Sequence, residues 1–221
     1  GHVVHVSSVA VYGLDKRPGP VLETDALAQQ PDHWAYYIRT KLEAEQKAAA
    51  VAEAANLDLS IMRLGLLYGP GAARPVGRGL VQLGSWRFVL GSGSNHLPYT
   101  YIDNAVDALL LAAARSHSGI EAYNIVDGPP RTVGDAARQD GEVRREKVRL
   151  VPVPPVLMST LARYFEHRNR NRETAPKLTR YVVRSATRDI IYDTRKARDR
   201  LGWEPAVDLE RGLQMTYGWQ S

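Results

Sequence analysis

The sequence predicts an α/β protein built around a parallel sheet. Short, nearly continuous apolar runs alternate along the chain with Ala-, Glu- and Lys-rich segments, and this alternation is typical of linked βαβ units. Clusters of glycine and proline separate many of the runs and mark turns. At 221 residues, with 44% hydrophobic and 24% charged residues, the chain can bury a substantial core and has the composition of a globular protein.

The first predicted strand covers residues 2–8, whose letters HVVHVSS end in two serines. A polar loop is expected from about residue 12 to 32, followed by a helix over 34–55 that is rich in good helix formers. Residues 59–67 read as another buried strand because they are almost continuously apolar. The turn sequence Tyr68-Gly69-Pro70-Gly71 closes that strand.

The second half of the chain continues the alternation after a Gly- and Arg-rich stretch, residues 71–98, which is expected to be dominated by loops. A short strand at 99–102 leads into a helix at 104–115, for which Asp103 is the expected cap. The remaining expected elements are strands at 122–126 and 148–153, an extended segment at 190–192, and helices at 156–168, 194–201 and 209–219.

Composition excludes several classes of protein. The absence of cysteine rules out disulfides, thiolate catalysis and Cys-bound metals. The six histidines have no paired ligand spacing, so no metal is expected. No apolar run reaches the roughly 18 residues of a membrane span, and no signal peptide is visible. We therefore expect a cytoplasmic protein with no membrane partner.

The most basic stretch, residues 163–188, holds eight Arg or Lys and two Glu. No base-reading motif accompanies these charges, so a solvated surface is expected and a nucleic-acid partner is not. Just before and within this stretch, Leu157, Leu161 and Phe165 recur at helical spacing. Core packing is the expected role of these three side chains, and a substrate-lining or membrane-touching role is the alternative.

Ser8, Tyr37 and Lys41 are the candidate catalytic residues. Tyr37 and Lys41 are four residues apart in a predicted helix, so they share one face of it. A tyrosine ordinarily titrates near 10, and a neighbouring ammonium favours its phenolate form, which suits acid–base work on an alcohol or ketone. Ser8 ends a strand at the edge where open α/β sheets bind ligands, and its hydroxyl suits a substrate oxygen.

The Tyr-x-x-x-Lys spacing is not specific by itself, because it occurs three times in this chain. Tyr12 and Lys16 flank Gly13 and precede Pro18, which disfavours a helix there. Tyr192 and Lys196 cross from an extended segment into a helix. Only the third pair, at positions 37 and 41, lies within a predicted helix and follows a serine-ended strand. A surface Tyr–Lys pair without catalytic meaning is the alternative from spacing alone.

Five blocks of the sequence, in order, resemble extended short-chain dehydrogenases/reductases, the epimerase/dehydratase superfamily. They are VSSVAVYG, YIRTK, RLGLLYGPG, LPYTYIDN and the C-terminal KA, LGW and P, at 6–13, 37–41, 63–71, 97–104 and 196–205. The resemblance extends over nearly the whole chain. It implies a Rossmann-type parallel sheet with a smaller substrate-binding lobe, and an NAD- or NADP-dependent enzyme.

The resemblance also implies roles for individual residues. Ser8 matches the serine that orients the substrate, and Ser7 lies near the nicotinamide. Tyr37 would be the catalytic acid or base, while Lys41 would bind the nicotinamide ribose and tune Tyr37. The nicotinamide end of the cofactor would also contact the backbone of Leu64, Gly65 and Leu66.

One part of the family pattern is absent, because no GxGxxG or GxxGxxG occurs in the 221 residues. The abrupt start, with Gly1 leading directly into a strand, favours truncation upstream and a missing N-terminal half of the Rossmann sheet. Residues 1–68 and 99–128 would then be a partial dinucleotide-binding domain, and 69–98 and 129–221 mainly the substrate-binding lobe. The intact protein is expected to be a homodimer, and this chain to be catalytically inactive alone.

The branch of the family bears on the substrate. Nucleotide-sugar members usually have an asparagine at the position of Leu66 and an arginine at that of Leu97. Both positions are apolar here, and the local sequence resembles the 3β-hydroxysteroid dehydrogenase and dihydroflavonol-reductase branches, although Arg74, Arg78 and Arg87 remain substitutes for the phosphate-binding arginine. The expected reaction is oxidation or reduction at a secondary alcohol or ketone of an apolar small molecule. The alternatives are a nucleotide-sugar epimerase or dehydratase, and a non-catalytic interaction protein.

Overall fold

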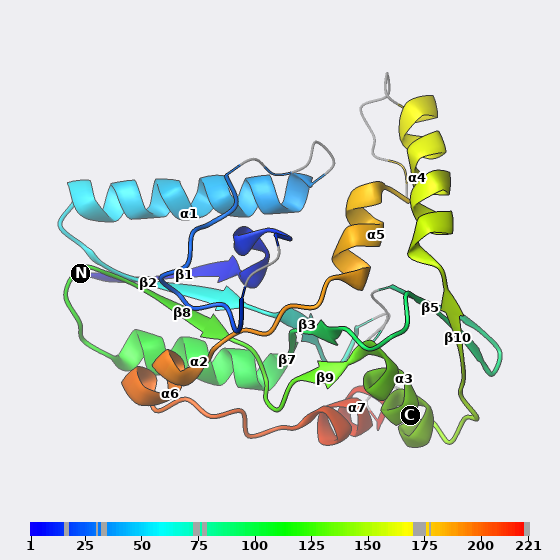
Figure 1. The fold of residues 1–221 in the computed structure, drawn as a ribbon. Helices are drawn as coiled ribbons and strands as arrows, with labels where there is room; N and C mark the ends of the chain where they lie inside the picture. Colours follow the sequence, from blue (N-terminus) through cyan, green and yellow to red (C-terminus); the bar gives the residue numbers. More distant parts are fainter. Residues whose placement is uncertain are drawn as a thin grey trace.

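A three-stranded parallel sheet lies at the centre of the main layer of the fold. The computed structural model describes residues 1–15, 18–29, 31, 35–72, 76, 79–169, 176 and 178–218. The strands β1 (His2–Ser8), β2 (Asp58–Leu64) and β8 (Ile120–Ile125) pair in the order β1-β2-β8. One face of this sheet is covered by α1 (Tyr36–Ala54), and the other by α2 (Ile102–Ala114) with α6 (Arg195–Leu201) beside it (Figure 1). The predicted α/β class with a parallel sheet is therefore confirmed.

The apolar character of the strands follows from their places in the sheet. β2 lies between two neighbours and is buried from Leu59 to Leu64. β1 pairs only with β2 among the described strands, and its Val3 and Val6 side chains are exposed. Between the sheet and α2, a cluster including Met62, Tyr123 and Trp203 forms the largest part of this layer's core.

The predicted continuous strand at 59–67 is wrong, because Gly65 divides it. β2 ends at Leu64, and β3 (Leu66–Tyr68) pairs in parallel with β7 (Tyr99–Tyr101). A Cβ atom at Gly65 would lie 2.2 Å from the carbonyl oxygen of Pro98. The amide of Leu66 donates to that same oxygen at 2.5 Å. Glycine permits this close backbone approach, at which the chain changes its pairing partner.

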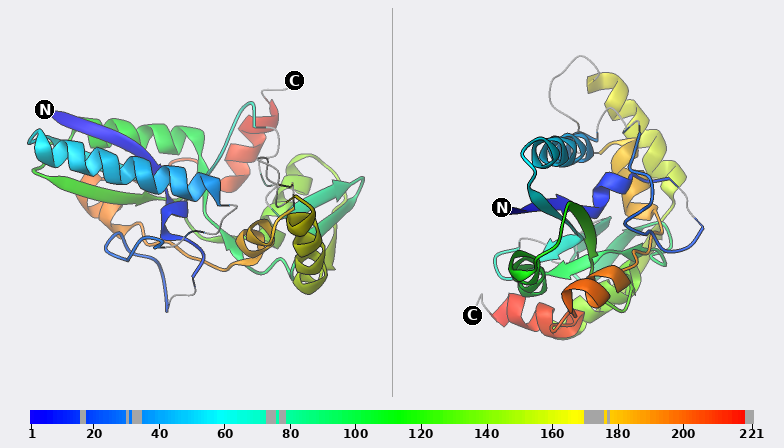
Figure 2. Two further views of the ribbon diagram at one scale, coloured as in Figure 1. Left: turned by 90° about the horizontal axis from the view of Figure 1, so that it is seen from above. Right: turned by 90° about the vertical axis from the view of Figure 1, so that its left-hand side faces the viewer.

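The stretch at 71–98, which was expected to be dominated by loops, also contains strands that the sequence did not predict. β4 (Leu80–Leu83) and β5 (Trp86–Leu90) form an antiparallel hairpin there, and β10 (Arg149–Val153) pairs with β5 in parallel. β6 (His96–Leu97) pairs with β9 (Arg131–Thr132). The helices around these strands are α3 (Val133–Val143), α4 (Pro155–Asn169), α5 (Arg180–Thr187) and α7 (Leu209–Gly218). Figure 1 and the left view of Figure 2 place this second group of elements beyond the end of the parallel sheet.

Several smaller differences separate the predicted elements from the observed ones. The sequence reading missed α3, α5 and the short 3-10 helix η1 (Val9–Tyr12). The extended segment at 190–192 contributes only an isolated bridge between Val21 and Tyr192. The predicted ends at Trp34 and Trp219 lie outside the described residues.

The expectation that Leu157, Leu161 and Phe165 pack in the core is not met by the first two. Leu157 is 63% exposed and Leu161 42% exposed, while Phe165 is half-buried. The face of α4 that packs inward instead carries Ala162 and Glu166. The division of the chain into a dinucleotide-binding part and a substrate-binding lobe remains a prediction.

Candidate active site

A pocket of about 430 Å³ opens where β1 and β2 end. All seven residues assigned from the sequence line it, namely Ser7, Ser8, Tyr37, Lys41, Leu64, Gly65 and Leu66. Its opposite wall comes from α5 and the segment that follows, with Tyr181, Ser185, Arg188 and Tyr192. Its volume falls within the range of about 300–1,000 Å³ that is typical of small-molecule sites. Ligands of open α/β sheets bind at this carboxyl-terminal edge.

The two serines at the end of β1 have different hydrogen bonds. Ser7 is buried, and its hydroxyl donates to the Glu45 carboxylate at 2.6 Å. Ser8 Oγ accepts from the Ala10 amide at 3.3 Å and thereby caps η1. The proton of Ser7 is thus committed to a carboxylate, whereas Ser8 keeps its proton for another acceptor while lining the pocket.

Tyr37 and Lys41 lie one turn apart near the start of α1 and point into the same pocket. The Tyr37 side chain is 54% exposed. Lys41 Nζ donates to the carbonyl oxygen of Val6 at 3.0 Å, which ties the helix to the end of β1. α1 therefore holds the phenol and the ammonium beside the serine-ended strand.

The other two Tyr-x-x-x-Lys pairs have different surroundings. Tyr12 is buried, donates to Asn124 at 2.8 Å and accepts from Arg63 at 2.7 Å, and burial raises its pKa to about 12. Its partner Lys16 lies outside the described residues. Lys196 lies over the ring of Tyr123 and pairs with Glu121.

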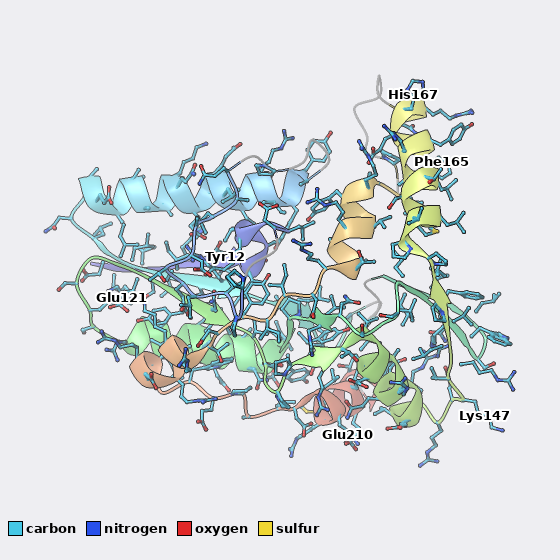
Figure 3. All side chains as sticks on the ribbon, in the orientation of Figure 1. Tyr12, Glu121, Lys147, Phe165, His167 and Glu210 are labelled. Carbon is cyan, nitrogen blue, oxygen red and sulfur yellow. The ribbon has the colours of Figure 1, made fainter. Side chains whose placement is uncertain are left out.

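A buried polar network behind the pocket was not predicted from the sequence. Arg63, on β2, pairs with Glu45 of α1 at 2.5 Å, and both side chains are nearly inaccessible to solvent. Glu45 also accepts the hydroxyl of Ser7, and Arg63 reaches Tyr12 near the centre of the molecule (Figure 3). The sequence did contain one indication of this network, because Arg63 lies in a largely apolar predicted strand. A buried charge needs a partner, so an acidic residue near Arg63 could have been predicted.

Arg188 is a further residue that the sequence reading missed. Its half-buried side chain lines the pocket, and within the described part of the chain it forms no ion pair. Of the arginines considered as substitutes, Arg87 is buried and pairs with Glu146 away from the pocket. Arg74 and Arg78 lie outside the described residues. Arg188 is thus a pocket cation available to an anionic group.

The predicted Asp103 cap of α2 is wrong. The helix begins at Ile102, two residues earlier than expected, Tyr101 is its N-cap, and Asp103 is an exposed residue of its first turn. The carboxylate of Asp127, which follows β8, accepts from the Tyr101 amide at 2.7 Å and from Asn104 Nδ2 at 3.0 Å. Burial nevertheless raises the pKa of Asp127 to about 7. A residue distant in sequence therefore supports the start of this helix.

This raised pKa predicts a pH-dependent stability. Because Asp127 binds its proton more tightly in the folded than in the unfolded state, its contribution to the free energy of unfolding is largest below about pH 4. We expect that contribution to fall as the pH rises to about 7, by roughly 4 kcal/mol at most. Urea unfolding of wild type and Asp127→Asn across this range measures it. The wild-type advantage over the variant should shrink with rising pH, whereas exposed Asp103→Asn should leave the profile unchanged.

Fold and pocket together define a Rossmann-like α/β protein whose ligand site is at the carboxyl-terminal edge of the sheet. Residues 1–126 match the model of the NAD dependent epimerase/dehydratase family, and the chain belongs to this family. Members of this family are enzymes that work with NAD.

Curated relatives and solved structures agree with the family. The chain is 27% identical over 228 residues to 3beta-hydroxysteroid-dehydrogenase/decarboxylase isoform 1 of Arabidopsis thaliana, with 97% of this chain and 52% of that protein covered. It is 29% identical over 223 residues to 2-alkyl-3-oxoalkanoate reductase of Stenotrophomonas maltophilia, covering 97% and 67%. MoeE5, solved with UDP-glucuronic acid and NAD, has a similar fold, with a TM-score of 0.70, 24% identity, and 99% of this chain and 64% of MoeE5 covered. The chain thus spans about half to two thirds of the length of these proteins.

No helix in the described part of the chain is both long and apolar enough to cross a bilayer. No group of three or more His, Cys, Asp or Glu side chains in the same residues is placed to hold a metal ion.

Proposed function

We propose that this chain carries the catalytic and substrate-binding residues of an NAD(P)-dependent oxidoreductase acting on a secondary alcohol or ketone. The observation that carries the proposal is the convergence of Ser8, Tyr37 and Lys41 on one pocket at the edge of the parallel sheet. Ser8 comes from β1, while Tyr37 and Lys41 come from α1, beyond the polar loop. A surface Tyr–Lys pair without a catalytic role would not be expected to share a pocket with this serine.

In this proposal each side chain has a distinct task. Tyr37 takes the hydroxyl proton of an alcohol, or gives a proton to the oxygen of a ketone. Lys41, one turn further along α1, adds a positive charge to the same pocket. Ser8 donates its free proton to the substrate oxygen and holds it within reach of Tyr37, while Ser7 remains bound to Glu45. The nicotinamide, when bound, accepts or supplies the hydride.

The residues present fit the nicotinamide half of a dinucleotide. Leu64, Gly65 and Leu66 line the pocket beside Tyr37 and Lys41, and we assign the nicotinamide ring to them. Lys41 is the ribose-binding residue of this proposal. No glycine loop for the pyrophosphate occurs in the 221 residues, so we assign that contact to a polypeptide segment outside them, which also decides between NAD and NADP.

The pocket favours a substrate with an apolar body and an anionic group. Leu66 and Leu97 line it at positions where nucleotide-sugar enzymes would need polar contacts. Arg188, on the opposite wall, suits a carboxylate. A relative with 29% identity is named for a 3-oxo acid, 2-alkyl-3-oxoalkanoate. We therefore propose an apolar 3-oxo or 3-hydroxy acid as the substrate class.

A binding comparison on the 221-residue chain tests this substrate class. An apolar 2-alkyl-3-oxo acid should bind more tightly than UDP-glucose by calorimetry. Arg188→Gln should weaken its binding roughly tenfold to a hundredfold, because a charge-assisted hydrogen bond is lost. Arg184→Gln is the matched control and should bind like wild type, because Arg184 is an exposed residue of α5, the helix just before Arg188, and lies outside the pocket.

The nucleotide-sugar alternative predicts the opposite ranking. Arg188 is also suited to a phosphate, and MoeE5 was solved with a UDP-sugar. If UDP-glucose binds more tightly than the 3-oxo acid and free UDP competes with it, the site belongs to an epimerase or dehydratase.

A further inference from the structure

Exposed apolar side chains gather on two connected elements at one end of the molecule. The first is the β4–β5 hairpin and the second is α4, which follows β10 directly. β10 is paired with β5, and Figures 1 and 2 place these elements together, beyond the end of the parallel sheet. The exposed fractions are 62% for Val81, 67% for Leu83, 43% for Trp86, 77% for Val156, 63% for Leu157, 42% for Leu161 and 57% for Tyr164. We call these seven residues the hairpin–α4 surface.

The exposed face of α4 is held in a fixed orientation. Leu157, Leu161 and Tyr164 recur at the spacing of one helical face. Elsewhere on α4, Ala162 and Glu166 are buried, and Glu166 pairs with Arg180 at the start of α5 at 2.7 Å. The helix is thus anchored by its inner side, and its apolar side has no partner among the described residues.

The segment from the end of α3 to the end of α4 is rich in positive charge. Residues 143–169 contain six Arg or Lys and two Glu. Both glutamates are already in ion pairs, Glu146 with Arg87 and Arg144, and Glu166 with Arg180. The exposed cations are Arg145, Lys147, Arg149, Arg163 and Arg168. Figure 3 shows Lys147 and His167 near the two ends of this side of the molecule.

This combination identifies the kind of partner. Apolar side chains flanked by Lys and Arg, with Trp and Tyr among them, are the pattern of proteins that lie in the interface of an anionic membrane. The Arg149 guanidinium lies over the ring of Trp86, with its central carbon 5.2 Å from the ring centroid. This surface therefore presents an aromatic ring and a cation side by side. A second copy of the chain would bring like charges face to face, which disfavours a symmetric dimer through this surface.

The sequence predicted no membrane partner; from this surface we propose instead that the hairpin–α4 surface docks the protein reversibly on an anionic phospholipid bilayer. α5 packs against α4 and contributes Tyr181 and Ser185 to the pocket, and Arg188 directly follows it. Docking therefore places the wall of the pocket close to the bilayer, from which an apolar molecule can reach it. The docking itself does not depend on the catalytic assignment.

Vesicle sedimentation of the 221-residue chain tests the proposal. The chain should sediment with phosphatidylcholine vesicles that contain phosphatidylserine, much less with phosphatidylcholine alone, and less as salt is raised. The double variant Leu157→Glu/Leu161→Glu should lower the affinity for the anionic vesicles about tenfold or more. Its matched control is Val51→Glu/Leu110→Glu, which changes two residues that are each 63% exposed on α1 and α2, and this control should bind like wild type.

A spectroscopic readout locates the contact. The difference in emission between wild type and Trp86→Phe isolates Trp86, and it should shift to the blue and be quenched by brominated lipids when anionic vesicles are added. The proposal is overturned if the chain ignores anionic vesicles or if both double variants lose binding equally. It is also overturned if a concentration-dependent dimer, dispersed by the α4 double variant, forms in place of vesicle binding.

Discussion

Tyr37→Phe should lower kcat by roughly 10²–10⁴-fold, which is the contribution expected of proton transfer by a positioned acid or base. The substitution removes only the phenolic oxygen. The aromatic ring is kept, and the Tyr37 side chain is 54% exposed. The fold should therefore be unaffected. The measurement is turnover of a ketone with NADH or NADPH, in a preparation that binds the dinucleotide, alongside a thermal unfolding curve.

The preceding residue supplies the control for this experiment. Tyr36 also belongs to α1 but does not line the pocket. Tyr36→Phe should therefore keep wild-type turnover. If Tyr37→Phe turns over like Tyr36→Phe, Tyr37 is not the acid–base residue, and the proposed oxidoreductase mechanism fails with it.

Glu45→Gln should lower the free energy of unfolding by about 3–5 kcal/mol, because it leaves the buried Arg63 guanidinium without its counter-charge. Such a loss is a large part of the total stability of about 5–15 kcal/mol that is usual for a domain. The carboxylate accepts hydrogen bonds from both Arg63 and Ser7, so the amide cannot satisfy both donors as well. Urea unfolding monitored by circular dichroism gives the value.

Two further variants test whether the loss of stability comes from the broken Glu45–Arg63 pair rather than from losing any glutamate of α1. Glu43→Gln changes an exposed glutamate of the same helix and should alter stability by less than about 0.5 kcal/mol. Replacing the pair together, as Glu45→Met/Arg63→Met, should recover much of the loss, because no uncompensated charge remains in the interior. A Glu45→Gln variant as stable as Glu43→Gln would contradict the pairing seen here.

The candidate active site was readable from the sequence because its signals are local. Tyr37 and Lys41 are a helical turn apart, and Ser8 ends an apolar strand. The requirement that ligands bind where parallel strands end is general. The structure brings these residues to one pocket, as expected. Their catalytic roles stay a prediction until Tyr37→Phe is measured.

The hidden parts of the site depend on contacts between distant segments. Glu45 and Arg63 belong to a helix and a strand whose pairing is decided by how α1 packs on the sheet. Arg188 follows a helix that the sequence did not reveal, because α5 has only 8 residues and so shows little more than two turns of any helical period. Asp127 supports α2 from the end of a different strand, which no local capping rule can indicate.

The sequence by itself determined the α/β class, the main strands and helices, and the identity of the Tyr, Lys and Ser candidates, since hydrophobic period and short spacings encode these directly. The tertiary structure decided where β2 breaks, because only the approach of Pro98 shows why Gly65 is needed there. It also decided that Leu157 and Leu161 of α4 face outward rather than into the core. A helical repeat of leucines marks one face of a helix, but only the packing of α4 on α5 determines which face is covered.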